Sequence, residues 1–272
     1  MPNLVFTNTP VLFGPFHIVM LLLVTTAALL LYKLVRIRNE DHLLQLLHRL
    51  GLIMILAEIW KQWFVLRYVY PDFSLWFFPW QLCSMAMYCS FFVTFVKEKY
   101  QNVLLVFLSS FSFFSAIVAL VVPSDMLRPQ IPLAVHGFIY HGIIIAESLI
   151  AIRILRQRSM HYQSSSVDSA SSHQATTSTG ERIRFAPAAL LFLIMSGIAE
   201  IINCIGHYLL PGHWPEPDMF YITPFYPSTQ PVCAYVAEKL GILPEILIYS
   251  AAIILISYLF YLVANCLHKI SL

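Results

Sequence analysis

The stretch PWQLCSMAMY, residues 79–88, sets a cysteine four residues after a proline, among otherwise apolar and aromatic side chains. If a helix begins near Pro79, the Cys83 thiol lies in its first turn, beside unpaired N–H groups and the positive end of the helix dipole. Both features stabilise a thiolate. A histidine alongside would complete a nucleophile and its base. Cys83 is therefore a candidate catalytic nucleophile, and the alternative is a small apolar residue that only packs.

Two histidines in the segment VHGFIYHG are candidates for that base. A helix that runs straight from about residue 75 would set Cys83 level with His141, whereas a helix that begins at Pro79 would set it nearer to His136. The sequence leaves both alternatives open. Because the two histidines are five residues apart, they point about 140° apart around a helix, so we do not expect them to bind one metal ion. Each histidine is also a candidate for a hydrogen-bonded packing residue.

Further ionisable side chains interrupt apolar segments, where such groups are costly and by default suggest function. They are His17, Glu58, Lys61, Glu200 and His207. Glu58 and Lys61 are three residues apart in AEIWKQW and share one helix face. They form either a structural ion pair or a site where Lys61 meets a lipid phosphate and Glu58 orients it. We expect these residues to line one cavity.

The elements that carry these residues are predicted to be membrane helices. Of 272 residues, 59% are hydrophobic and only 11% are charged, against about 25% charged in a soluble domain. An apolar run of about 20 residues spans a hydrocarbon core of about 30 Å. Such runs lie at approximately 11–33, 45–68, 75–97, 101–122, 131–155, 185–209 and 243–266. The fold class is therefore an all-α polytopic membrane protein, with seven transmembrane helices in a single domain over residues 1–272.

The basic residues give the expected orientation, because cytoplasmic loops carry an excess of lysine and arginine. Most of the 16 lie at one set of helix ends: Lys33, Arg36, Arg38, Arg49, Lys97, Lys99, Arg153, Arg156, Arg158, Arg182, Arg184 and Lys269. We therefore expect the N-terminus outside and the C-terminus in the cytoplasm, which sets the polar residues above in the outward half of the membrane. Topology accounts for the basic residues, so nothing indicates nucleic acid as a partner.

Two interruptions stand out between the apolar runs. Residues 159–181 are rich in serine and threonine and are predicted to form a flexible cytoplasmic linker. His161 and His173 within it have no companion ligands, so a solvated loop is favoured over a metal site. Residues 211–231 contain six prolines and several aromatic residues. They form either an ordered outer lid at the membrane interface or a simple connector.

The five cysteines show no CxxC pair and no metal-ligand spacing, so we predict no metal and no cofactor. Cys204 and Cys233 both reach the outer side, where a disulfide is allowed in an oxidising compartment. Signatures of metalloproteases, nucleotide-binding loops and serine hydrolases are also missing from the sequence.

Five short segments resemble the YwaF-type integral membrane family of bacteria and, more distantly, the animal acyltransferase family of transmembrane protein 164. They are PFHIV (15–19), HRLGLIMILAEIWKQW (48–63), FPWQLCSMAMY (78–88), IYHGIII (139–145) and FYITPFYP (220–227). The resemblance implies that Cys83 and His141 are the catalytic pair. The bacterial pattern has histidines where this chain has Gln81 and Tyr140, which leaves fewer auxiliary proton carriers. A multi-pass protein of the bacterial plasma membrane is expected.

Two functions follow from these observations. In the first, the protein is a membrane acyltransferase or lipid hydrolase that uses a Cys83 thiolate to take an acyl chain from a glycerolipid in the outer leaflet. Its auxiliary or substrate-binding residues would be His17, Glu58, Lys61, Gln81, His136 and Glu200, with Lys61 or His17 at the phosphate or the oxyanion. In the second, it is a non-enzymatic lipid or small-molecule binding, transport or sensor protein. Either way, membrane lipids are the expected partners.

Overall fold

The computed structural model describes residues 4–70, 75–123, 125–171, 183–210, 216–228 and 230–270. Within these ranges the named elements are all helical. They are α1 (Pro15–Val35), α2 (Glu40–Tyr68), η1 (Leu75–Phe77), α3 (Ser84–Phe92), α4 (Glu98–Phe107), η2 (Leu108–Ser112), α5 (Phe113–Val121), α6 (Ile131–Ser171), α7 (Ala186–Leu209), η3 (Met219–Tyr221), α8 (Pro231–Leu240) and α9 (Ile242–Ile270). The α4, η2 and α5 segments follow without a break, with η2 as a π-helical turn. The predicted all-α class is confirmed.

Local chemistry explains where several helices begin. Proline stands at the first or second position of α1 and α7, where its missing N–H removes no helical hydrogen bond. The side chain of Asn39 caps α2 by accepting a hydrogen bond from the His42 N–H, and Glu40 and Asp41 follow in the first turn. These are the cap and the charges that favour a helix N-terminus.

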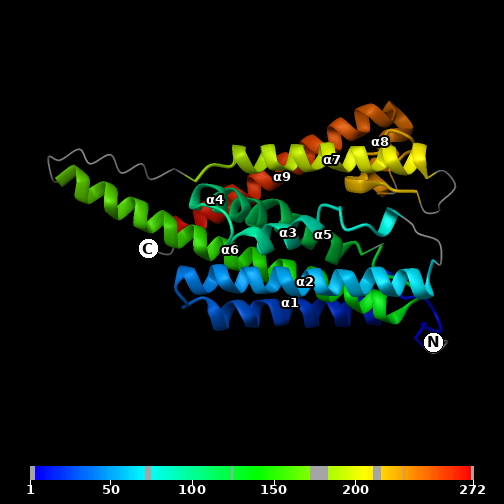
Figure 1. Ribbon diagram of the computed structural model, residues 1–272, viewed down its shortest axis with the longest axis horizontal. Coiled ribbons are helices and arrows are strands. Elements are labelled where there is room, and N and C mark those ends of the chain that lie inside the picture. The colour runs from blue at the N-terminus through cyan, green and yellow to red at the C-terminus, as the bar shows by residue number, and fades with distance from the viewer. Residues whose placement is uncertain are drawn as a thin grey trace.

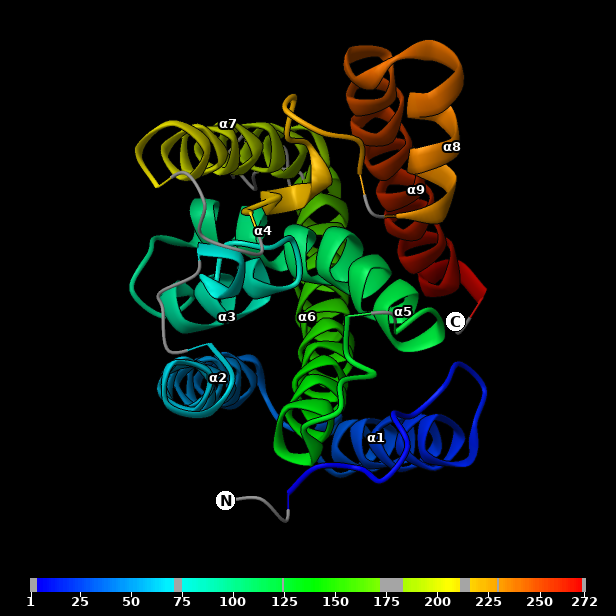
Figure 2. The same cartoon turned by 90° about the vertical axis from the view of Figure 1, so that its right-hand side faces the viewer.

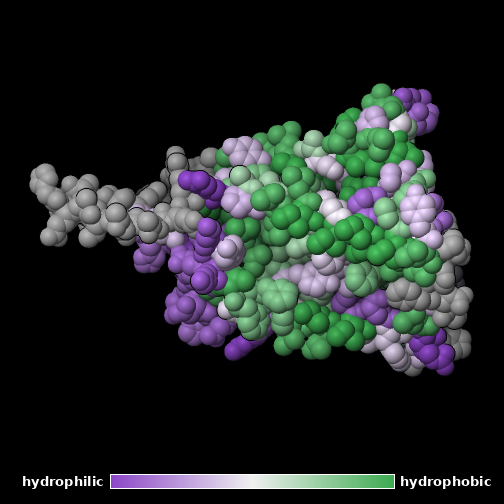
Figure 3. All heavy atoms as spheres, turned by 45° about the horizontal axis from the view of Figure 1, so that its top comes forward, coloured by the Kyte–Doolittle hydropathy of each residue, from purple (hydrophilic) through white to green (hydrophobic). Residues whose placement is uncertain are grey.

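Within the described residues, six helical segments are long and apolar enough to cross a membrane. They are Pro15–Val35, Glu40–Tyr68, Glu98–Val121, Ile131–Tyr162, Ala186–Leu209 and Ile242–Ala264. The long helices lie roughly along one axis, and the two chain ends lie toward opposite ends of it (Figure 1). Seen down that axis, α6 is central, with α1, α2, α3 and α5 around it (Figure 2). Apolar side chains cover the middle of the surface, and hydrophilic ones gather toward its ends (Figure 3).

The third predicted span, residues 75–97, is not a continuous helix. Only Ser84–Phe92 is α-helical, after the 3₁₀ turn η1 and an irregular stretch around Pro79. Proline lacks a backbone N–H and restrains the residue before it, which disfavours one helix through this run. A nine-residue helix is too short to span a bilayer by itself.

This broken segment nevertheless follows α2 in the opposite direction. The Gln62 amide bonds to the Phe77 carbonyl near one end of α2, and His48 Nδ1 lies 2.7 Å from the Phe91 carbonyl oxygen toward the other. The fourteen helical steps from residue 48 to residue 62 correspond to about 21 Å. A Cβ added at Gly51 would lie 2.4 Å from the Phe91 nitrogen, so glycine is what lets the two backbones approach.

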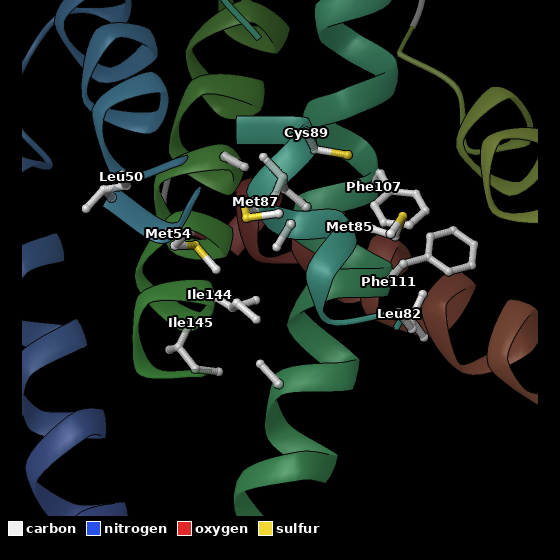
Figure 4. Packing of buried hydrophobic residues seen from close by; sticks show 14 of the residues in the cluster. Leu50, Met54, Leu82, Met85, Met87, Cys89, Phe107, Phe111, Ile144 and Ile145 are labelled. Atoms are coloured by element: carbon white, nitrogen blue, oxygen red, sulfur yellow. The ribbon is translucent and has the colours of Figure 1, made fainter. Parts of the chain in front are cut away.

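The core buries most of α3. Met85, Ala86 and Met87 are buried and pack with side chains of the neighbouring helices, among them Met54 and Phe111 (Figure 4). Burial of the helix body fixes the position of the turn that precedes it, and Cys83 lies in that turn.

The α6 helix runs further than expected. It continues to Ser171, so the first part of the predicted linker over 159–181 is helical, while residues 172–182 lie outside the described ranges. Extending a helix that already exists costs much less than nucleating one, so a polar stretch without apolar periodicity can still continue it. His173 falls outside the described residues, and among those described no cluster of potential metal ligands is found.

Candidate functional site

Cys83 occupies the position immediately before α3. The helix begins at Ser84, five residues after Pro79, and the Ser84 N–H donates to the Gln81 carbonyl at 2.8 Å in its first turn. The Tyr88 hydroxyl donates back to the Pro79 carbonyl at 3.1 Å. Pro79 therefore precedes the helix and does not kink it, which is the alternative in which the sequence sets Cys83 nearer to His136 than to His141. Cys83 is partly exposed and lies at the N-terminal end of α3, where the Ser84, Met85 and Ala86 N–H groups donate to the Gln81, Leu82 and Cys83 carbonyls.

Glu58 and Lys61 form the ion pair that their spacing predicts. Glu58 is buried and also accepts a hydrogen bond from the Gln62 amide at 2.9 Å, so its position is fixed from two sides. Lys61 lies within electrostatic reach of Cys83, His136 and His141. Lys61 is therefore a positive charge that acts on the candidate nucleophile and on both candidate bases.

His141 has the hydrogen-bonding arrangement of a base. Its Nδ1 lies 2.7 Å from the Gly137 carbonyl oxygen, which can only accept, so Nδ1 carries the proton. The Nε2 atom is buried and has no hydrogen-bond partner. The lone pair of neutral His141 is consequently on Nε2 and free to take a proton.

His136 also has an unpartnered, buried Nε2. Its ring faces the Ala57 backbone and stacks between the rings of Trp60 and Tyr140, at centroid distances of 5.7 and 5.6 Å. The Tyr140 hydroxyl is buried beside Ser84 without a well-formed hydrogen bond. The region around Cys83 thus contains several polar atoms that the protein itself leaves unpaired, which is uncommon for buried groups.

His17 is bound differently. Its Nδ1 accepts a hydrogen bond from the Phe13 N–H at 3.0 Å, and its Nε2 donates to the Leu120 carbonyl at 2.8 Å. The side chain is fully buried. Both ring nitrogens are occupied in joining the start of α1 to the end of α5, so His17 has no free nitrogen for a phosphate or an oxyanion.

Gln81, two residues before Cys83, holds the segment after α7. Its Nε2 donates to the Asp218 carbonyl at 3.0 Å, and its Oε1 accepts from the Phe220 N–H at 2.9 Å. From the other side, Asn203 Oδ1 accepts from the Met219 N–H at 2.7 Å. Residues 216–228, which we call the lid, are therefore docked on the turn that carries the thiol. Its backbone is an ordered part of the site.

The lid is held in an uncommon backbone conformation. Phe220 and Tyr221 both have positive φ angles, 61° and 56°, which few residues other than glycine adopt. The Tyr221 hydroxyl donates to Asp125 at 2.5 Å, and Phe220 is buried against Phe192. Such strain persists only where surrounding contacts determine it, and it concentrates at functional sites.

Asp218 is a buried acid within the lid. Its Oδ1 accepts from the Thr223 N–H at 3.1 Å, whereas its Oδ2 has no partner. Burial raises the pKa of Asp218 from 3.8 to about 7, the Thr223 N–H opposes that rise, and the nearby carboxylates Glu245, Glu200 and Asp125 add to it. The side chain therefore exchanges its proton near neutral pH.

Glu200 supports the lid from α7. Its carboxylate accepts from Asn203 at 3.3 Å and is 3.7 Å from the Cys204 sulfur. Cys204 and Cys233 are both free cysteines, so no disulfide joins them. Sequence reasoning missed Asn203, Asp125 and Asp218 as site residues. The density of prolines and aromatic residues in 211–231 was the one available signal.

The fold and its apolar helices define a multi-pass integral membrane protein. A family model described as the TMEM164 family matches residues 12–170, more than half of the chain, and the chain belongs to that family. The matched range includes Cys83, His136 and His141 and ends before the lid. No curated protein and no solved structure matches the chain significantly.

Proposed function

We propose that the protein is a thiol-dependent acyltransferase, or a lipid hydrolase, that acts on glycerolipids with Cys83 as nucleophile and His141 as base. The observation that carries the proposal is the tautomer of His141: its Nδ1–H is held by the Gly137 carbonyl, and its Nε2 is unprotonated and unpaired. The position of Cys83 immediately before α3 supports it, because the positive end of a helix dipole stabilises negative charge.

The reaction has two steps. The Cys83 thiol gives its proton to His141 Nε2, and the sulfur attacks the ester carbonyl of a glycerolipid. A C–S bond forms, the ester C–O bond breaks, and the lysolipid leaves with the proton from His141. The hydroxyl of an acceptor lipid then attacks the thioester and restores the free thiol. If water is the acceptor, the outcome is hydrolysis.

Lys61 is the residue we assign to the developing oxyanion or to the lipid phosphate. Its ammonium is 20% exposed, is paired with Glu58, and is near Cys83 and His141. A fixed positive charge where negative charge develops is a common source of transition-state stabilisation. His17 is left out of this role because both of its ring nitrogens are bound.

The proposal includes an orientation. With the N-terminus outside and residues 75–97 as a broken seventh crossing, Cys83 and the lid lie in the outer half of the bilayer. The distribution of basic residues supports this orientation, as do the chain ends, which lie toward opposite ends of the bundle (Figure 1). Glycerolipids of the outer leaflet are then the substrates in reach.

The test is acyl transfer by purified protein in detergent micelles that contain a phospholipid labelled in one acyl chain. We expect a labelled acceptor lipid or fatty acid, and we expect the product to disappear with Cys83→Ala. Cys89→Ala is the matched control, because Cys89 is a buried cysteine on the same helix. Full turnover by Cys83→Ala would overturn the proposal and leave the unpaired polar groups as a binding pocket.

A further inference from the structure

A cavity of about 380 Å³ opens between α2 and α6. Its walls include Ala57 and Trp60 of α2 and His136, Ile139, Tyr140 and Ile143 of α6. Apart from His136 and the tyrosine hydroxyl, this lining is apolar. Trp60 and Ile139 are 38% and 49% exposed, so the cavity is an open groove. Both walls belong to segments long and apolar enough to span a membrane.

The position of the groove sets which molecule can fill it. All of its lining residues lie within two candidate membrane spans, Glu40–Tyr68 and Ile131–Tyr162, so in a bilayer the groove meets lipid chains. On α6 it extends from Pro132 to Ile143, eleven helical steps or about 16 Å. That length is about half of a hydrocarbon core of about 30 Å, the depth of one leaflet.

The two ends of the groove differ in polarity. Toward its outer end, next to Trp60, lies the charged pair Lys61 and Glu58, with Lys61 20% exposed. Ile143 lies at the inner end, seven residues or about two turns beyond His136 along α6. An amphiphile with a phosphate in its headgroup and an apolar tail matches this order, with the phosphate near Lys61 and the tail along Ile139 and Ile143.

The groove is also continuous with the candidate active site. Tyr140 forms part of its wall, lies beside Ser84 and is within electrostatic reach of Cys83. His136, another wall residue, is within reach of Lys61, as is His141. In the end view, α3 lies next to both α2 and α6 (Figure 2). Passage between α2 and α6 at this level therefore leads from the bilayer toward the thiol.

We infer that this groove binds one acyl chain of a bilayer glycerophospholipid and is the lateral entrance through which the ester bond reaches Cys83. The stacked rings of Trp60, His136 and Tyr140 form part of its wall, and two of their buried atoms, His136 Nε2 and the Tyr140 hydroxyl, have no hydrogen-bond partner behind that wall. This assignment rests on the proposed function for its catalytic meaning, whereas lipid binding in the groove does not depend on it.

The test uses the full chain in phosphatidylcholine nanodiscs that contain phosphatidylcholine with a diazirine in one acyl chain. After illumination, cross-linked peptides are identified by mass spectrometry. We expect cross-links concentrated at residues 57–60 and 132–143. Ile139→Trp fills the groove without adding charge, and displacing about two methylenes should lower cross-linking there about tenfold. Ile205→Trp, at a residue of α7 that is 41% exposed, is the control and should leave it unchanged.

Cross-linking no denser in the groove than along the exposed faces of α7 and α9, or unaffected by Ile139→Trp, would overturn the inference. Cys83→Ala separates this outcome from failure of the proposed function. Groove cross-links that persist in Cys83→Ala while acyl transfer is lost support both proposals. If groove cross-links form and Cys83→Ala keeps full transfer, the groove assignment stands and the catalytic role of Cys83 is rejected. If transfer needs Cys83 but no cross-links form in the groove, the catalytic role stands and the groove assignment is rejected.

Discussion

Two sites on α6 differ in how fully one buried side chain is hydrogen-bonded, although Arg156 Nε and Gln157 Oε1, beside the better-bonded Arg158, also lack partners. Toward one end, the Arg158 guanidinium is buried, and each of its nitrogens donates a hydrogen bond, to Glu40, Asn102 or Gln101, at 2.6–2.9 Å. Toward the other, His136 and His141 each leave one buried ring nitrogen unpaired. Buried polar atoms that are all hydrogen-bonded stabilise a structure, whereas buried polar atoms without partners are available to bind a ligand.

The elements around the two ends differ in the same sense. Arg158 joins the first turns of α2 and α4 to α6, all regular helix. The Cys83 end has a helix that begins only after Cys83, a lid with positive φ angles and a buried acid without a full set of partners. We therefore expect the Arg158 end, which we call the anchor, to contribute mainly to stability, and the Cys83 end to contribute mainly to function.

The largest expected effect that distinguishes the two ends is a loss of acyl transfer when a histidine at the Cys83 end is replaced. His141→Gln removes the free Nε2, and acyl transfer should fall about 10²–10⁴-fold, the usual contribution of a general base. Thermal unfolding in detergent should change little. His136→Gln in the same assay decides which histidine serves Cys83, and His42→Gln, at an exposed residue at the start of α2, is the control. A larger loss in His136→Gln than in His141→Gln would reverse our assignment.

The anchor should respond in the opposite way. Arg158→Met leaves Glu40 and Asn102 without their partner and should destabilise the protein by about 3–5 kcal/mol. The transfer rate per folded molecule should stay near that of the wild type. Denaturant or thermal unfolding gives the first quantity, and activity normalised to folded protein gives the second. Arg153→Met removes an exposed hydrogen bond from the same helix and should cost about 1 kcal/mol or less.

The lid can be displaced without touching a polar group. A Cβ at Gly206 would lie 2.1 Å from Pro217 Cγ, so Gly206→Ala should weaken lid docking by about 1–3 kcal/mol. Amide hydrogen exchange in residues 216–228 and alkylation of Cys83 should both become faster. Gly197→Ala on the same helix meets no atom within 4 Å and should leave both rates unchanged. Equal protection in the two variants would mean that the lid does not cover the thiol.

The smallest expected effect is a pH dependence of the stability with which the lid is docked. The pKa of Asp218 is raised to about 7, so the folded lid favours the protonated acid. That contribution to lid stability is fully present below the unfolded pKa of 3.8 and is lost as pH rises from there to about 7, because Asp218 ionises in the displaced lid while the docked lid keeps it protonated. The protection factors of the lid amides, which exclude the intrinsic pH dependence of exchange, should therefore fall between pH 5 and pH 7 and level off above pH 7. Asp218→Asn should flatten the profile, and Glu238→Gln, at an exposed residue, should not.

The sequence determined the membrane class and most of the helices. Runs of apolar residues long enough to cross a bilayer predicted six spans that the structure contains, because hydrocarbon leaves the backbone no partner except its own helix. Spacing alone predicted the Glu58–Lys61 ion pair, since residues three apart share a helix face. The pattern in PWQLCSMAMY likewise pointed to a thiol at a helix start.

Only the tertiary structure decided how those residues are used. His17 and His141 both interrupt apolar segments of the sequence. Both ring nitrogens of His17 are hydrogen-bonded, to Phe13 and Leu120, whereas Nε2 of His141 has no partner. Gln81 proved to hold the lid because Asp218 and Phe220, almost 140 residues later, fold back onto it. Such contacts depend on which helices become neighbours, a property of packing between distant segments that local periodicity does not encode.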